Sequence, residues 1–265
     1  AFVGNTVAIS GTAANFSLPD GSTQQQVVAP AYFDFTSSSV STATVSDKGI
    51  TTVVGPGTSK ITATLDDVTA TGSLTINSTG TFVHAPTPTH DAANVISIFS
   101  DHYTNEPGTN FNPYWGDSNV KSADFKVTED GVEDNVLNYY DFYAIPSQTK
   151  WAYVVNVLSP TINASAMSYF HVDIFVPTGT STSATMNITL VDFGANGVDG
   201  GGDDTTIPYT VPSSQLVPGK WNSIEIPLKG KTKNKIGHIK YADGVNITNF
   251  WVDNAYFYKE NIPTA

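Results

Sequence analysis

Hydrophobic and polar residues alternate along much of the chain, which is typical of β-strands with one buried face. The alternating segments are residues 61–65, 74–76, 170–176, 186–190, 224–228 and 251–257. The sequence shows no convincing amphipathic helical period. The pattern therefore predicts an all-β protein in which sheets pack face to face over apolar cores. In the C-terminal part it also predicts that the polar face of one sheet is available to a ligand.

The aromatic residues are unevenly distributed, which indicates two domains. All four tryptophans lie after residue 110. Residues 85–91 read Ala-Pro-Thr-Pro-Thr-His-Asp, and prolines among small polar residues favour a stiff, extended connection. We expect a small domain at residues 1–82 and a larger one at 83–265, with residues 83–93 as a linker. The pattern favours an immunoglobulin-like β-sandwich for the first domain and a β-jelly-roll sandwich for the second.

One run of the small domain carries a family likeness. The matching positions are Ala43-Thr-Val45, Gly49, Gly57-Thr58 and Ile61-Thr-Ala63. With them, most of residues 3–77 resembles the bacterial immunoglobulin-like domain, group 2, although Phe35 stands where the family usually has tryptophan. The resemblance implies a spacer on a surface protein and no chemistry.

Composition narrows the choice of partner and cofactor. The chain carries a net charge of -12, and all 12 of its basic residues are lysine. Without arginine and with this charge, nucleic acid and anionic membranes are poor partners. The absence of cysteine excludes disulfides and thiolate metal sites. No apolar run has the length of a membrane span, and no signal peptide is present, so an exported protein would have a leader outside this sequence.

Several segments of the large domain resemble a family of glycan-binding modules. They are Val95–Asn105, Leu190–Gly194 with Gly200–Asp204, Lys220–Leu228 and Phe250–Tyr258. They look like the non-catalytic jelly-roll modules of laminarinases and of surface glycan-binding proteins in Bacteroidota polysaccharide-utilisation systems. The resemblance implies capture of a neutral β-glucan, with laminarin (β-1,3-glucan) favoured. It also implies a secreted or outer-membrane-anchored protein, with other outer-membrane glycan-uptake components as partners.

A glycan-binding module needs flat aromatic rings for sugar C–H faces, and polar groups for the hydroxyls. The candidates are Trp115, Tyr139, Tyr140, Asp141, Trp151 and Tyr153. The structural alternative for each ring is packing inside the fold, and the sequence does not decide which of the two adjacent tyrosines is exposed. Trp221 begins a strand, which favours a structural role, whereas Trp251 fits either interpretation.

Modules of the resembled family often carry a structural calcium where the first and last strands meet. Asp101 and Asp253 match those positions, and Asn105 is a weaker third ligand. Carboxylate oxygens are the ligands that calcium prefers. The alternative is that Asp101 caps a turn and Asp253 pairs with a lysine. The acidic, glycine-rich loop at 192–204 lacks EF-hand spacing, so we interpret it as a rim of the site.

Two other function classes stay open. Residues 129–134 superficially match the Glu-x-Asp-x-x-Glu signature of laminarinases, but Asp130-Gly131 is a typical hairpin turn and the central Asp is one place early. His171 beside Asp173 on a polar strand face leaves a polysaccharide lyase as a weak alternative. A protein–protein adhesion or scaffold module is the other. The favoured prediction is a non-catalytic surface protein.

Overall fold

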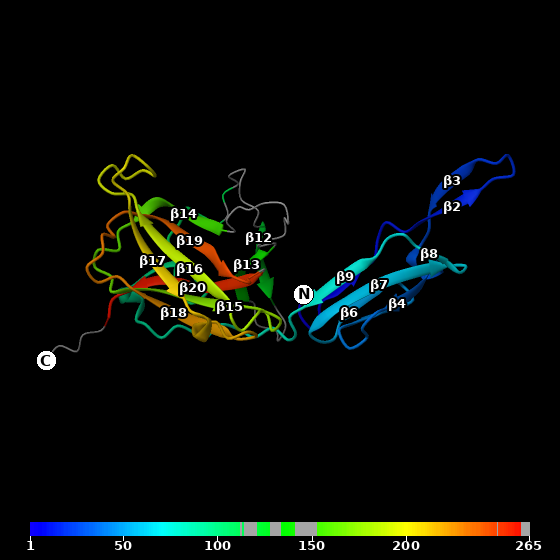
Figure 1. The fold of residues 1–265 in the computed structure, drawn as a ribbon, viewed down its shortest axis with the longest axis horizontal. Coiled ribbons are helices and arrows are strands. Elements are labelled where there is room, and N and C mark those ends of the chain that lie inside the picture. Colours follow the sequence, from blue (N-terminus) through cyan, green and yellow to red (C-terminus); the bar gives the residue numbers. More distant parts are fainter. Residues whose placement is uncertain (112, 114–120, 128–133, 141–152, 248, 261–265) are drawn as a thin grey trace. The chain divides into compact units, whose positions relative to one another are not determined.

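The computed structural model describes residues 1–111, 113, 121–127, 134–140, 153–247 and 249–260; for residues 121–127, 140 and 243–245 it describes only the backbone. The chain forms two compact units, residues 1–82 and 83–265 (Figure 1). In the described residues there is no α-helix, and three short 3-10 turns lie at η1 Pro30–Tyr32, η2 Ala92–Asn94 and η3 Ser213–Gln215. The prediction of an all-β protein is confirmed.

Small antiparallel sheets make up unit 1, the name used below for residues 1–82. One contains β1 (Thr6–Ala8), β6 (Ile50–Val53) and β5 (Ala43–Val45). Another contains β4 (Asp34–Ser37), β7 (Gly57–Leu65), β8 (Val68–Thr69) and β9 (Leu74–Ser78). β2 (Ala13–Ser17) and β3 (Thr23–Val27) pair only with each other, as a hairpin. The immunoglobulin-like assignment of this unit stays a prediction.

Two antiparallel sheets form unit 2, residues 83–265. Sheet I has the order β12 (Lys121–Val127), β13 (Asp134–Tyr140), β20 (Phe250–Tyr258), β15 (Tyr169–Phe175) and β18 (Trp221–Pro227), and β10 (Val95–Phe99) also pairs with β20. Sheet II has the order β11 (Thr109–Asn110), β14 (Tyr153–Ile162), β19 (Ile236–Val245), β16 (Thr185–Asp192) and β17 (Thr205–Val211). Figure 1 shows the strands of the two sheets in two layers, as a β-sandwich requires.

Alternation builds the core of unit 2. In β16 every second residue is buried, so Met186, Ile188 and Leu190 reach the core while the residues between them face outward. The same period places Ile239 and Tyr241 of β19 in the core. Burying apolar surface of this kind contributes about 25 cal/mol per Å². The polar positions between these core residues are therefore left on the outer face of sheet II.

The outer face of sheet I is covered by residues 83–94 of the same unit. Asn254 donates from Nδ2 to the backbone oxygen of Pro86 over 3.0 Å, and His90 Nδ1 lies 3.1 Å from the hydroxyl of Tyr256. Trp221 donates from Nε1 to the backbone oxygen of Val83. This covering explains why all nine residues of β20 are buried. The proline-rich stretch thus packs on the sandwich in addition to being extended.

Candidate functional site

The outer face of sheet II is the broad polar surface of unit 2. Strand register brings three rows of side chains side by side across β14, β19, β16 and β17. The rows are Tyr153, Ala242, Asn187 and Thr210; Val155, Lys240, Thr189 and Pro208; and Val157, His238, Val191 and Thr206. We call these twelve residues the open face. It combines an aromatic ring, hydroxyl and amide groups, and short apolar side chains.

The aromatic ring of Tyr153 lies at one corner of the open face, at the start of β14. Lys240 places its ammonium 4.5 Å from the centre of the half-buried Tyr153 ring, a cation–π contact that restricts both side chains. In the same row as Tyr153, Thr210 donates from Oγ1 to Asn187 Oδ1 over 2.8 Å, which orients that amide. Thr189 lies opposite Lys240 in the register. These groups can donate hydrogen bonds to, and accept them from, a hydroxylated ligand.

The loop between β16 and β17 borders one end of the open face. Asp203 accepts hydrogen bonds from the backbone N and Nδ2 of Asn196, which lower the pKa of its exposed carboxyl. Asp192 accepts from the backbone N of Gly194 and of Lys235. The loop is thus shaped by its own side chains, which agrees with its interpretation as a rim.

His238 stands where this loop meets the open face. Its ring packs edge-on against Phe193, with ring centres 4.8 Å apart. Burial lowers the pKa of His238, and the nearby Asp199 and Asp204 offset part of that effect. The lowered pKa favours the neutral imidazole at pH 7, so His238 adds no charge to the open face.

The glycan-binding residues predicted from the sequence fall into three groups. Tyr153 lies on the open face, as a glycan-binding ring would. Trp115, Asp141 and Trp151 lie outside the described residues, and Tyr140 ends β13 without a described side chain. Tyr139 is fully buried between the sheets. A ring with no exposed face cannot stack on a sugar, so Tyr139 is not retained as a binding residue.

Polar contacts inside the sandwich hold Tyr139 in place. Its hydroxyl donates to the backbone oxygen of Phe111 over 3.1 Å and accepts from Asn156 Nδ2 over 2.7 Å. Its ring packs against Phe250, with centres 5.2 Å apart. A buried phenol needs such partners. Alternation put Tyr139 and Tyr140 on opposite faces but left open which face is the core.

Both tryptophans whose side chains the structure describes pack against other residues of the fold. Trp221 packs against Phe175, with ring centres 5.6 Å apart, besides its bond to the segment that covers sheet I. Trp251 is 3% exposed and also contacts Phe175. This agrees with the structural interpretation of Trp221 and decides the open case of Trp251 in favour of burial.

The predicted calcium ligands have different surroundings. Asp253 is buried, and burial together with the carboxylates of Asp134, Asp101 and Asp173 raises its pKa to about 8. Asp101 accepts two hydrogen bonds from Asn135, at 2.7 Å from the backbone N and 2.6 Å from Nδ2. Within the described ranges no group of three or more His, Asp or Glu side chains is arranged to hold a metal ion.

Asn105 is occupied by the fold itself. Its amide oxygen accepts from the Ser97 hydroxyl over 2.7 Å, and its Nδ2 donates to the backbone oxygen of Ser100 over 3.1 Å. Asp134 was not among the calcium ligands predicted from the sequence, but it acts electrostatically on Asp253. It also pairs with His84 at 2.8 Å. Carboxylates are the donors that a hard cation prefers, but Asp101, Asp134 and Asp253 are not arranged as a three-ligand site, and the side chain of Asn105 is hydrogen-bonded within the fold.

His171, considered for a lyase, is enclosed. Its Nδ1 lies 2.6 Å from Glu225 and its Nε2 lies 3.4 Å from Asp173, and its ring stacks on Tyr256 with centres 4.6 Å apart. Burial lowers its pKa, but the two carboxylates outweigh burial and raise the pKa to about 9. A protonated, 7% exposed imidazole is a poor general base, so the lyase alternative gains no support here.

Lys240, Asn187, Thr189 and Thr210 were not among the sequence-predicted site residues. The signal that could have found two of them is the alternation of Asn187 and Thr189 with apolar neighbours, which marked the polar side of one strand. Lys240 and Thr210 could be identified only from the register of β19 and β17 with β16.

In the residues that the structure describes, no helix has the length and hydrophobicity needed to cross a membrane.

Comparisons with known proteins give structural neighbours only. No family model matches the chain, and no curated protein shows a significant match. The family 11 carbohydrate-binding module of the Clostridium thermocellum cellulase Lic26A-Cel5E has a TM-score of 0.40 at 16% identity, covering 63% of this chain and 95% of that one. The family 30 module of Cel9D-Cel44B from the same organism has a TM-score of 0.40 at 17% identity, covering 63% and 99%. A family 29 module complexed with mannohexaose has a TM-score of 0.38 at 8% identity, covering 62% and 89%. These values assign the chain to no family.

Proposed function

We propose that unit 2 is a non-catalytic module that binds a neutral β-glucan, with laminarin favoured, and that unit 1 carries it as a spacer outside the cell. The observation that supports this is the open face. It presents the ring of Tyr153 beside hydroxyl and amide groups, while the outer face of sheet I is covered by residues 83–94. The mechanism is capture: the ring stacks on a sugar face, and Asn187, Thr189 and Lys240 bind hydroxyls.

Charge supports a neutral ligand. The chain has a net charge of -12, and the acidic loop at 192–204 borders the open face. An anionic polysaccharide would be repelled by this field, whereas a neutral glucan would not. The single ammonium of Lys240, which lies over the ring of Tyr153, does not reverse the net charge of -12. Shallow faces of this kind give modest affinity, so a long glycan that repeats its binding unit suits them.

Affinity electrophoresis of the full chain tests the proposal. Native gels would contain laminarin, mixed-linkage β-glucan, alginate or no glycan, and the glycan would be recovered afterwards for size analysis. We expect retardation in laminarin, little in alginate, and no change in glycan length. Shortened glycan would show an enzyme instead. Migration that is the same in all four gels would contradict glycan capture and favour a protein partner.

We also propose a structural calcium ion at Asp101 and Asp253, the two carboxylates that the resemblance implies, with Asp134 as a neighbouring charge; the described side chains do not form a ready three-ligand site. Calcium would supply the positive charge that these carboxylates lack, since the pKa of Asp253 is raised to about 8 by burial and by its acidic neighbours. Calcium binds the ionised carboxylate, so its effect grows as Asp253 loses its proton. We expect 1 mM calcium, about physiological for the extracellular space, to raise the melting temperature of the full chain, and more so at pH 9 than at pH 6.

Chelation with EDTA should reverse this increase, and Asp253→Asn is the matched variant. The variant keeps the size of the side chain but cannot ionise, so its melting temperature should not respond to calcium. Magnesium at the same concentration controls for ionic strength. A melting temperature of the parent chain that is equal in calcium, magnesium and EDTA at pH 9 would remove the calcium site from the proposal.

A further inference from the structure

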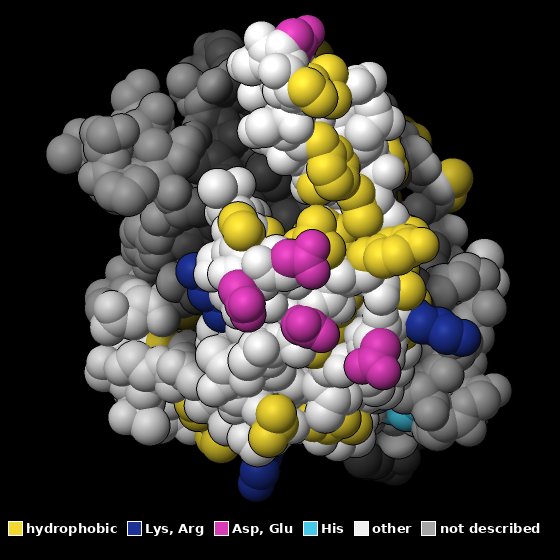
Figure 2. Space-filling view, turned by 90° about the vertical axis from the view of Figure 1, so that its right-hand side faces the viewer, with side chains coloured by type: hydrophobic (Ala, Val, Ile, Leu, Met, Phe, Trp, Pro, Cys, Tyr) yellow, Lys and Arg dark blue, Asp and Glu magenta, His cyan; other side chains and the backbone are white. Residues whose placement is uncertain are grey.

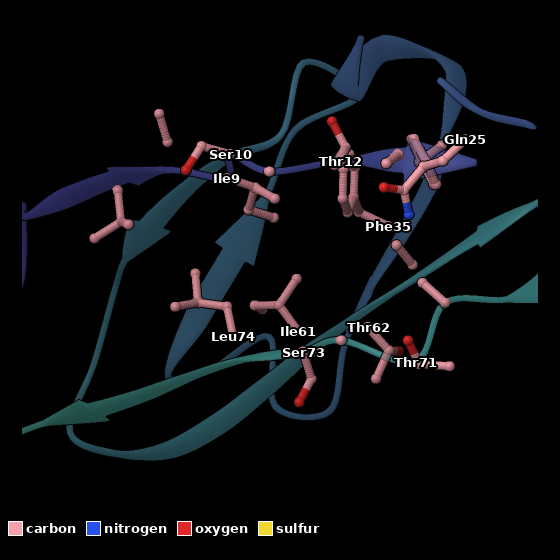
Figure 3. Close-up of a pocket in the computed structure, with 18 residues that line it drawn as sticks. Ile9, Ser10, Thr12, Gln25, Phe35, Ile61, Thr62, Thr71, Ser73 and Leu74 are labelled. Carbon is pink, nitrogen blue, oxygen red and sulfur yellow. The ribbon is translucent and has the colours of Figure 1, made fainter. Parts of the chain in front are cut away.

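Unit 1 contains a hollow of about 620 Å³ (Figure 3). It is lined by β1 and the residues that follow it, by β4 and β7, and by the residues from Ala70 to Leu74. Protein interiors are close-packed and rarely keep voids much larger than a water molecule. A volume of this size is within the usual range of small-molecule sites, about 300–1,000 Å³.

The lining of the hollow has two chemical parts. Apolar side chains form one part, which includes Phe33, Phe35, Ile61 and Leu74; the rings of the two phenylalanines lie 6.2 Å apart between centres. The labelled side chains in Figure 3 come from opposite sides of the hollow, with Thr12 and Phe35 on one side. A ring such as that of Phe35 offers a flat apolar surface to the C–H face of a sugar.

Polar side chains form the second part. Ser10, Gln25, Thr71 and Ser73 line the hollow, and in the described structure their side chains make no hydrogen bond to another residue. They are exposed and thus ready to exchange water for a ligand hydroxyl. No lining residue is charged. This set accepts a neutral, hydroxylated molecule and offers nothing to balance an ionised one.

The β2–β3 hairpin borders the hollow, which Ala13 and Gln25 help to line. Almost every residue of its two strands is exposed, and among its apolar side chains Phe16 is 49% and Val27 is 90% exposed. Figure 2 looks onto unit 1 and shows hydrophobic side chains in a band that begins at the hairpin, at the top. Gly72, in the wall of the hollow, has no atom within 4 Å of the position that a Cβ would occupy. The wall of the hollow at Gly72 therefore borders open space.

We propose that this hollow is a second binding site, separate from the open face, for a short neutral saccharide of one or two rings. The apolar part stacks on the sugar, and the four unpaired polar side chains bind its hydroxyls. Such a site makes unit 1 a binding unit in its own right. One end of a polysaccharide can then bind in unit 1 while the open face binds another part of the same polysaccharide. The two sites together bind the polysaccharide more tightly than either site alone.

Chemical-shift mapping on the full, isotope-labelled chain tests this site, with cellobiose and laminaribiose as saccharide probes and ANS, an anionic dye that binds apolar surfaces, as the alternative ligand. We expect saturable shifts at the amides of Ser10, Thr71 and Ser73. Ala63→Phe, which places a ring in the hollow, should weaken these shifts at least about tenfold in apparent Kd, equivalent to about 1.4 kcal/mol. Val68→Phe is the control, since Val68 is 70% exposed and does not line the hollow.

The outcomes separate this site from the proposed function. Loss of the shifts at unit 1 in Ala63→Phe, with retardation in laminarin gels retained, supports a second site. Gly72→Val provides a second blocked variant if Ala63→Phe does not fold. No saccharide shift at unit 1 in the parent chain, or shifts with ANS alone, overturns the proposal and leaves the open face untouched.

Discussion

Asp173→Ala is expected to lower the free energy of unfolding of unit 2 by about 3–5 kcal/mol. Asp173 is 1% exposed and supports three neighbours: it lies 3.4 Å from His171, accepts from the Ser223 hydroxyl over 2.6 Å, and accepts from Asn254 Nδ2 over 2.9 Å. Removing the carboxylate takes away one of the two acidic partners of the buried His171 imidazolium and one acceptor of the buried Asn254 amide, while the exposed Ser223 hydroxyl can turn to water. A buried charge or donor that loses its partner lowers the free energy of unfolding by its desolvation cost. Urea denaturation of the parent chain and the variant measures the difference.

Glu225→Gln is the matched control. Glu225 is the other carboxylate of His171, at 2.6 Å, but 42% of its side chain is exposed, so water screens it. Its replacement should cost clearly less than that of Asp173, and Tyr258, whose hydroxyl donates to Glu225 over 3.1 Å, keeps an amide oxygen as acceptor. Equal losses in the two variants would contradict the view that burial of Asp173 decides the cost.

The same cluster predicts a direction for the pH dependence. The pKa of His171 is raised to about 9 in the folded chain, above its ordinary value of 6.5. Its contribution to stability is therefore fully present below pH 6.5 and is lost as pH rises through 9, an effect of at most about 3 kcal/mol. Asp253, with its pKa raised to about 8, acts in the same direction, because its protonated form is favoured by folding. Stability should fall from pH 6.5 to 9, and fall less steeply in Asp173→Ala.

How far the sequence predicts the fold depends on whether the pattern is local. The alternation in β16 is local: Met186, Ile188 and Leu190 against Asn187 and Thr189 predicts both the core and the polar face, and the structure has both. β20 is different. All nine of its residues are buried, because residues 83–94 cover the side that faces away from the core. The residue pattern within β20 cannot predict that a segment 160 or more residues away in the chain packs over this strand.

The candidate site shows the same division. Tyr153 was predicted together with Trp151, which was expected to begin a strand, and the structure places Tyr153 on the open face. Tyr139 was predicted as part of the aromatic cluster at residues 138–143 and is in the core, since a pair of adjacent tyrosines on one strand does not indicate which ring is inside. Asp134 lies far from Asp253 in the sequence, and only the pairing of β13 with β20 brings their strands together. Partners across a sheet depend on register, which the pattern of one strand does not contain.

Tyr153→Ala is expected to weaken retardation in laminarin gels by about five- to tenfold in apparent Kd, equivalent to roughly 1–1.4 kcal/mol for one stacked ring. The ring is the exposed aromatic group that the described part of the open face offers, and its removal also frees Lys240 from the contact at 4.5 Å. Stability should change little, because the ring is half-buried and outside the core cluster.

Two companion variants distinguish stacking from other effects. Tyr153→Phe keeps the ring and loses only the hydroxyl, so its retardation should stay within about twofold of the parent if stacking carries the affinity. Asn187→Ala keeps Tyr153 and removes an amide that Thr210 orients over 2.8 Å; it should weaken binding by the loss of a ligand hydrogen bond, roughly 0.5–1.5 kcal/mol. If Tyr153→Ala and Asn187→Ala both migrate like the parent in laminarin while the parent itself is retarded, the glycan binds elsewhere on unit 2 and the open face is not the site. Weakening in both variants would locate the ligand across β14, β19 and β16, because these two side chains belong to one row of the register.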